Sequence, residues 1–447
     1  MNIALLKSAL MIAIPVTLQT LFFSSKGLID LMMIGQLSEE NIAAMGVGSR
    51  ALFVATILLS GVTAGGAMLV AQFHGARKGK RISQSTALTW LMTSLFAIAP
   101  ILLFATYGAD IVGLSSGDDN VRHLGHQYLT ITGISLLFIA YSTSIAAALR
   151  STHQATLGTL FSIVGITVNV FLNWVLIFGH LGAPSMGLKG AAIATLIAAG
   201  FEALCIFVYL YASKHLLAFK ARDLFASLRP KYIRQFWTLS LPTTFNFLVW
   251  AGGLFTYTAI MGQASDIGLV ALAVMTPIES VALALLVGTA NASSVIVGNQ
   301  IGAKDYNAAY YQAVFFTVAA IVLTLCVAVA LYLLRTPILN TFTSLSAEAR
   351  LLAETFYTIL CFGIVLRSLP TNMVVGVLRA GGDVKFCLYQ DIFTQWFFGI
   401  PIAAFCALFI GLPPEAIYAT FFLETLFKWV ACLYRFRSKK WIHQLAH

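Results

Sequence analysis

Residues 15–36, PVTLQTLFFSSKGLIDLMMIGQ, decide the fold because residues 242–263, PTTFNFLVWAGGLFTYTAIMGQ, repeat them without a gap. One shift of 227 positions superimposes the prolines and the closing Gly-Gln pairs, and the same frame continues for forty residues beyond them. Shared leucines are expected by chance in an apolar chain, but a proline, several glycines and a glutamine in one frame are not. The matched positions are Pro15 with Pro242, Gly35-Gln36 with Gly262-Gln263, Gly61 with Gly288, and Gly75-Ala76 with Gly302-Ala303.

The composition places both copies in a lipid bilayer. Hydrophobic residues make up 59% of the 447 residues and charged residues 10%, and the mean hydropathy is +0.87. An ordinary soluble domain is about 25% charged, so a water-soluble fold of this size would lack the charges to cover its surface. We therefore expect an all-α integral membrane protein. The apolar runs predict twelve transmembrane helices, at residues 8–34, 45–72, 84–107, 122–148, 155–179, 187–212, 235–262, 269–297, 308–333, 352–378, 386–410 and 415–436.

The net charge of +10 follows the predicted topology. Nineteen of the 27 lysines and arginines lie in one set of alternate connecting segments, which includes both termini. Basic loops stay in the cytoplasm, so we expect both termini to be cytoplasmic, in a multi-pass protein of the cell membrane, the inner membrane of a bacterium. The charge is therefore no sign of nucleic-acid binding. The lipid bilayer itself is the expected large partner.

The duplication divides the chain into two halves. We expect an N-terminal lobe over residues 1–212 (spans 1–6), a basic cytoplasmic linker over 213–234, and a C-terminal lobe over 235–447 (spans 7–12). Six spans per half give both halves the same orientation, so their pseudo-twofold axis is expected along the membrane normal. Such repeats suit alternating access, in which one six-helix bundle rocks against the other.

The order of these motifs resembles the multidrug and toxic-compound extrusion (MATE) family. The resemblance rests on Pro15, Asp30 and Gly35 in span 1, on the Gly-Ala pairs after spans 2 and 8, and on Leu149-Arg150 and Leu378-Arg379 after spans 4 and 10. It covers nearly the whole chain and is closer to the DinF-like branch than to the NorM-like branch. It implies a monomeric exporter of amphipathic, often cationic drugs and toxic organic compounds, driven by H+ or Na+ entry.

Asp30 is the main candidate for ion coupling. A charged group within the bilayer costs about 2.5–3.5 kcal/mol on insertion scales, and the equivalent position in the second half is Tyr257, so the shared fold does not require the carboxylate. Burial favours the neutral form of an acid, and proton loss leaves an anion that attracts a cationic drug. Lys26 lies one turn earlier on the same helix face; it either pairs with Asp30 or extends to a polar surface.

Three polar residues and one proline complete the candidate site. Asn169 and Asn173 lie one turn apart in span 5, and Thr195 lies in span 6. They are expected to hold Asp30 in place or to relay its proton through water, or else to serve as structural contacts between helices. In the resembling family the position of Asn173 is an acid in some members. Pro15 removes a backbone hydrogen bond from span 1, so this helix is expected to bend, unless the proline is only a packing kink shared with Pro242.

The second half favours H+ over Na+. The acids that the NorM-like branch carries in spans 7 and 10 correspond here to Trp250 and to Arg367-Ser368. Na+ prefers several oxygen ligands, which a set containing Arg367 does not supply. Glu279, Asp391, Glu424 and Lys428 are the other intramembrane charges of this half, and pairing of Arg367 with Glu279 or Asp391 is the simplest expectation.

The sequence carries no signature of an enzyme. It has no Gly-rich phosphate-binding loop and no cluster of metal ligands, so no cofactor is expected and an ion gradient must drive transport. The alternative function is a flippase for lipid-linked saccharides of the same superfamily fold. Such a cargo carries pyrophosphate and needs several basic groups, and few intramembrane residues qualify. A channel or receptor is disfavoured by the paired six-span repeats.

Overall fold

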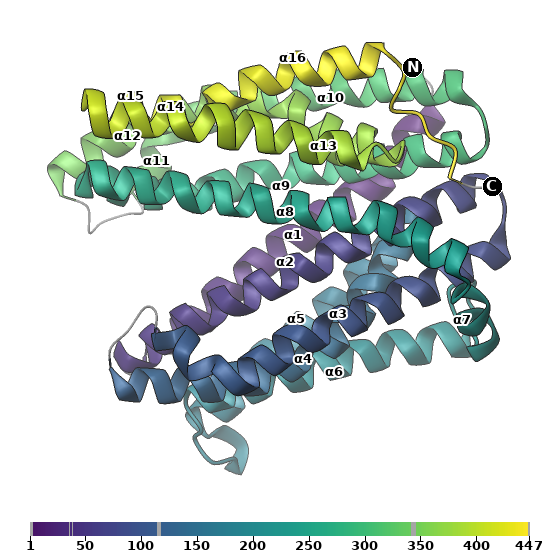
Figure 1. Cartoon of the computed structure of the whole chain (residues 1–447). Helices are drawn as coiled ribbons and strands as arrows, with labels where there is room; N and C mark the ends of the chain where they lie inside the picture. Colours follow the sequence, from purple (N-terminus) through teal and green to yellow (C-terminus); the bar gives the residue numbers. More distant parts are fainter. Residues whose placement is uncertain (1–2, 35, 38, 114–117, 341–345, 446–447) are drawn as a thin grey trace. The chain divides into compact units, whose positions relative to one another are not determined.

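A computed structural model describes residues 3–34, 36–37, 39–113, 118–340 and 346–445. Every regular element in these ranges is helical (Figure 1). Eleven helices of the described residues are long and apolar enough to cross a membrane, and α1 adds the shorter apolar stretch Leu6–Phe22. The predicted class, an all-helical membrane protein, is confirmed. Gly35 of the repeat lies outside the described residues.

The contacts divide the chain into two compact units, and the chain passes from one to the other within α1 and α8. The first-half unit comprises Leu18–Thr244, and the second-half unit comprises Met1–Thr17 with Phe245–His447. The two passages, after Thr17 and after Thr244, are 227 positions apart, which is the shift of the sequence repeat. The expected lobe boundaries at residues 212 and 235 describe the sequence repeat, and they stay a prediction. The contact units follow a different division, because each unit contains the N-terminal part of the first span of the other half.

The first-half unit is a bundle of long helices. Figure 1 shows α3, α4 and α6 lying along one another, and α2 and α5 also pack against α4. The short helix α7 lies within the predicted linker. The bounds are α1 Ile3–Ile34, α2 Glu39–Gly75, α3 Gly79–Gly113, α4 Asp119–Ser151, α5 Ala155–Phe178, η1 His180–Gly182, α6 Leu188–Ala212, α7 Ala221–Ser227 and α8 Pro230–Ala264.

In the second-half unit, α9, α10 and α12 pack on one another, and three π-helical segments interrupt the last spans. The bounds are α9 Asp266–Gly302, α10 Tyr306–Leu333, α11 Arg335–Asn340, α12 Ala347–Thr371, η2 Asn372–Leu378, α13 Val384–Asp391, η3 Ile392–Gly399, α14 Ile400–Ala404, η4 Phe405–Ile410, α15 Pro414–Thr420 and α16 Leu423–Arg437.

Matching glycines let helix backbones approach closely in each unit. In the first-half unit, a Cβ on Gly61 of α2 would meet Thr244 of α8. The repeat-related pair recurs in the second-half unit, where a Cβ on Gly288 would meet Thr17. Small residues at helix crossings permit the close backbone packing on which helix association in membranes depends. The glycines of the repeat are therefore packing positions.

Candidate coupling site

Asp30 lies near the C-terminal end of α1, and only 6% of its surface is exposed. Lys26 places its Nζ atom 2.8 Å from Asp30 Oδ2, one turn earlier on the same helix. Of the two arrangements considered for Lys26, the structure therefore has the ion pair. The other carboxylate oxygen, Oδ1, accepts a hydrogen bond of 2.6 Å from Asn173 Nδ2 of α5.

Asn169 and Thr195 join this cluster from α5 and α6. With its amide nitrogen turned toward the carboxylate, Asn169 donates to Asp30 Oδ1 at 3.2 Å, and its oxygen accepts from the Thr195 hydroxyl at 3.3 Å. Residues of α1 and α5 thus contact the carboxylate directly, and α6 supports it through Asn169. Asn173 Oδ1 is buried and has no hydrogen-bond partner among the described residues. That oxygen belongs to the same amide whose nitrogen contacts Asp30.

Tyr128 of α4 is a neighbour that the sequence analysis did not single out. It is 4% exposed, its phenol interacts electrostatically with Asp30, and its ring lies where a Cβ on Gly48 would be. A tyrosine is common in apolar spans, so only its burial beside a carboxylate distinguishes it. A hint in the sequence is Gly48, whose missing side chain makes room for a ring.

Pro15 lies inside α1, which continues unbroken from Ile3 to Ile34. Thr17 donates to the carbonyl of Ala13 at 2.8 Å. Gln19 instead extends to α5, where its Nε2 atom donates to Ser162 Oγ at 2.7 Å. Pro15 therefore lies apart from the Asp30 cluster along α1, two residues before the chain leaves the second-half unit.

The intramembrane charges of the second-half unit are paired. Arg367 lies against Glu279, one of the two partners expected for it. Asp391 pairs with Lys428 at 3.1 Å, and Lys428 also lies 3.9 Å from Glu424. Sequence alone did not distinguish the two possible partners of Arg367, because pairs from different spans depend on helix packing.

The position equivalent to Asp30 also contacts a carboxylate. Tyr257 donates to Glu424 Oε2 at 2.9 Å. Asn246 Nδ2 donates to Asp391 Oδ2 at 2.5 Å, and Arg379 donates to Asn246. This network stabilises the second-half unit through buried hydrogen bonds.

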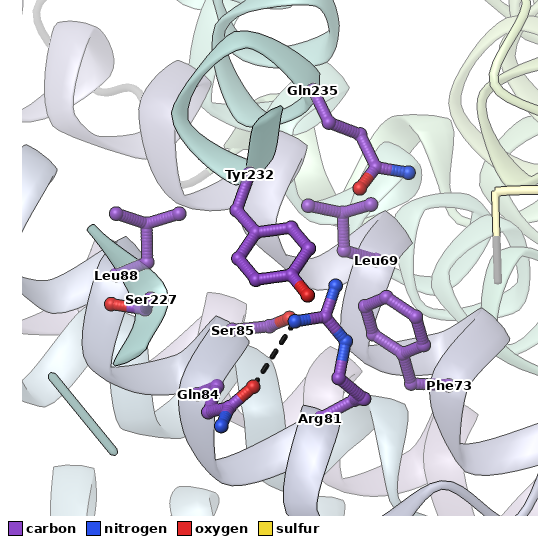
Figure 2. A pocket seen from close by; sticks show the side chains of 9 residues that line it. All are labelled: Leu69, Phe73, Arg81, Gln84, Ser85, Leu88, Ser227, Tyr232 and Gln235. Carbon is purple, nitrogen blue, oxygen red and sulfur yellow. Dashed lines mark hydrogen bonds between the residues drawn. The ribbon is translucent and has the colours of Figure 1, made fainter. Parts of the chain in front are cut away.

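A small pocket lies where α2, α3, α7 and α8 meet in the first-half unit. Figure 2 shows the Arg81 side chain between two aromatic rings, with its guanidinium carbon 3.6 Å from the Tyr232 ring centroid and 5.1 Å from that of Phe73. Arg81 also donates to Gln84 Oε1 at 3.0 Å. These contacts connect the end of α2 to the beginnings of α3 and α8. The lining residues are Leu69, Phe73, Arg81, Gln84, Ser85, Leu88, Ser227, Tyr232 and Gln235, and they include none of the candidate coupling residues.

Comparisons with known proteins agree with this architecture. The MatE family model matches residues 15–175 and 242–405, that is, both repeats. The chain is 24% identical to the uncharacterized transporter YisQ of Bacillus subtilis over 96% of this chain and 94% of that protein. It is 25% identical to a probable multidrug resistance protein NorM of Bacillus cereus over 95% of each chain.

A solved MATE transporter of Vibrio cholerae has the same fold, with a TM-score of 0.88, 19% identity and 98% of both chains covered. These relatives and neighbours are transporters, not enzymes. The family model accounts for most of the chain and falls on the same two stretches that the internal repeat defines. This chain therefore belongs to the MatE family of multidrug and toxic-compound extrusion transporters.

Proposed function

We propose that this transporter exports amphipathic, often cationic organic compounds in exchange for H+, with Asp30 as the group that binds the proton. The observation that carries the proposal is the buried carboxylate itself, held by Lys26 on one oxygen and by asparagine amides on the other. Protonation neutralises the carboxylate, and deprotonation restores a charge that attracts either Lys26 or a cationic cargo.

The ligands around Asp30 favour H+ over Na+. Na+ needs several oxygen ligands, as hard cations do. Around Asp30 the near groups are N–H donors instead: an ammonium on Oδ2 and an amide on Oδ1. A proton needs one acceptor beside it, and Asn173 Oδ1, which has no other partner among the described residues, can accept from a protonated carboxyl group once its amide turns. No cofactor is part of this mechanism.

The exchange then follows from competition for one carboxylate. When Asp30 takes up a proton, its ion pair with Lys26 is lost, and Asn169 and Asn173 keep the neutral carboxyl in place. When the proton leaves, cargo binding and re-formation of the pair are alternatives. Pro15 supports a bend of α1 during this step, since an internal proline leaves one backbone carbonyl without its helical partner.

The assignment to the DinF-like branch is part of this proposal, because the candidate site lies in the first half and the NorM-like acids of the second half are absent. The location in a bacterial inner membrane, the cytoplasmic termini and the monomeric state are proposed with it, on the basic connecting segments. The flippase alternative is not favoured: three of the intramembrane basic groups that could bind a pyrophosphate, Lys26, Arg367 and Lys428, are neutralised by carboxylates.

Export by the Asp30→Asn form tests the proposal. The purified protein in liposomes is given a fluorescent organic cation under an imposed H+ gradient and, separately, an imposed Na+ gradient. We expect H+-driven export by the unaltered chain and its loss in Asp30→Asn. The control is Asp110→Asn, which removes a carboxylate whose side chain is 69% exposed. Full export by Asp30→Asn, or export that only Na+ drives, would refute the mechanism.

A further inference from the structure

Two polar contacts join α1 to α5 at different depths. Gln19 donates to Ser162, and Asn173 donates to Asp30. Both pairs are 143 positions apart, so α1 and α5 run parallel in one register. The two contacts are eleven residues apart along each helix, which is about 16 Å or three turns. The Gln19–Ser162 contact is the one nearer the N-terminal end of α1.

The same two levels continue from α5 to α6. Asn169 contacts Thr195 at the level of Asp30. Seven residues back along α5 and seven forward along α6, Ser162 contacts Glu202. The matching steps show that α5 and α6 are antiparallel here. The Glu202 carboxylate lies directly against Gly165, where a Cβ would overlap it. Glu202 thus faces α5, and its side chain is partly buried.

At this level the hydrogen bonds run in one direction, from Gln19 to Ser162 and from Ser162 to Glu202. The Gln19 amide donates to Ser162 Oγ at 2.7 Å, which leaves the Ser162 hydroxyl hydrogen to donate to the Glu202 carboxylate. In the described part of the chain, Ser162 is the one polar partner of Glu202, and no basic side chain acts on this carboxylate. A carboxylate inside the membrane without a cation is stable chiefly when it binds a proton.

The second half carries an acid at the equivalent level. The repeat places Asn246 on Gln19, with the shift of 227, and Asp391 on Ser162, with the shift of 229. Asn246 donates to Asp391, as Gln19 does to Ser162. There Lys428 neutralises the acid, whereas no base among the described residues of the first half acts on Glu202. The difference leaves Glu202 as the carboxylate whose neutralisation requires a proton.

We propose that Glu202 is a second proton-binding site, three helix turns from Asp30 on the same line of contacts between α1, α5 and α6. This inference rests on the proposed function and adds a second site to the path that the proton takes after it leaves Asp30. The Asp30 carboxyl group gives up its proton to water, the Glu202 carboxylate takes up one proton from water, and Glu202 later returns it to water nearer the N-terminal end of α1. One O–H bond is broken and one is formed at each transfer.

Infrared difference spectra between low and high pH test the site directly on the whole purified protein. The unaltered chain is expected to show a carboxylic-acid band that disappears in Glu202→Gln and persists in Asp30→Asn. Ser162→Ala keeps the Glu202 carboxylate but removes the hydroxyl that donates to it. That donor stabilises the ionised form, so its removal favours the protonated acid. Its band is therefore expected to persist to higher pH, by about one unit, since a hydrogen bond to a charged group contributes roughly tenfold. Ser162→Thr, which keeps the hydroxyl, is expected to restore the original position.

The control is Thr167→Ala on the exposed face of α5, whose hydroxyl bonds only within its own helix. In liposomes, Glu202→Gln is expected to slow H+-driven export about tenfold with unchanged cargo affinity. If Glu202→Gln retains the band and the rate, or if Ser162→Ala leaves the band unmoved, the inference is wrong while Asp30 stays the coupling group. If Asp30→Asn exports normally, the proposed function fails instead. Should Glu202→Gln not fold, the Ser162 variants decide alone.

Discussion

Replacing Lys26 with methionine tests the ion pair that the structure places at the centre of the site. The ammonium lies 2.8 Å from a carboxylate that is almost fully buried. Methionine keeps an unbranched apolar chain of similar length but cannot neutralise Asp30. The ionised form then loses a charge-assisted contact of about 1.5–3 kcal/mol.

That loss corresponds to roughly ten- to hundredfold tighter proton binding, because every 1.4 kcal/mol is about tenfold. The sign follows from which form Lys26 stabilises. It supports the anion, so its removal favours the protonated acid, and the alkaline limb of the export profile should move to higher pH by about one to two units.

The assay is export of a fluorescent organic cation from liposomes over a series of pH values at one fixed pH difference. Lys26→Arg keeps the charge and should keep the profile. Lys189→Met removes an exposed lysine at the start of α6 and should do the same. An identical profile for Lys26→Met and the unaltered chain would refute the reasoning, because it would mean that the pair does not affect proton binding at Asp30.

Two further variants test the packing of each unit. Gly65→Val should lower the unfolding free energy by about 1–3 kcal/mol and so lower the unfolding temperature, because a side chain at this position overlaps Ser240. Gly46→Ala is the control and should be neutral, because nothing lies within 4 Å of the added Cβ. Equal unfolding temperatures for the two variants would contradict the close packing at Gly65. Lys428→Met should destabilise the second-half unit by about 3–5 kcal/mol, because it leaves buried carboxylates unpaired. The double variant Lys428→Met/Asp391→Asn should recover much of that loss in denaturant unfolding, and no recovery would mean that Asp391 is not the main partner of Lys428.

Much of the fold is contained in the sequence, for reasons of solvent and chain geometry. A bilayer accepts only helices and closed β-barrels, and apolar runs of about twenty residues indicate helices. Composition and run length therefore predict the helical membrane class and the approximate spans. The repeat around Pro15 and Pro242 predicts two related halves. The four-residue spacing of Lys26 and Asp30 predicts a shared helix face, because that neighbourhood is set by the helix itself.

The contacts between helices were decided only by the tertiary structure. Asn173 and Glu202 reach their partners through the register of α5 against α1 and α6, and Lys428 rather than Arg367 pairs with Asp391 through the packing of the second-half unit. In a soluble protein, an apolar stripe would show which face of each helix is buried. Lipid is as apolar as the protein interior, so these helices carry little such signal, and the inward faces are fixed by close packing and by hydrogen bonds between distant residues.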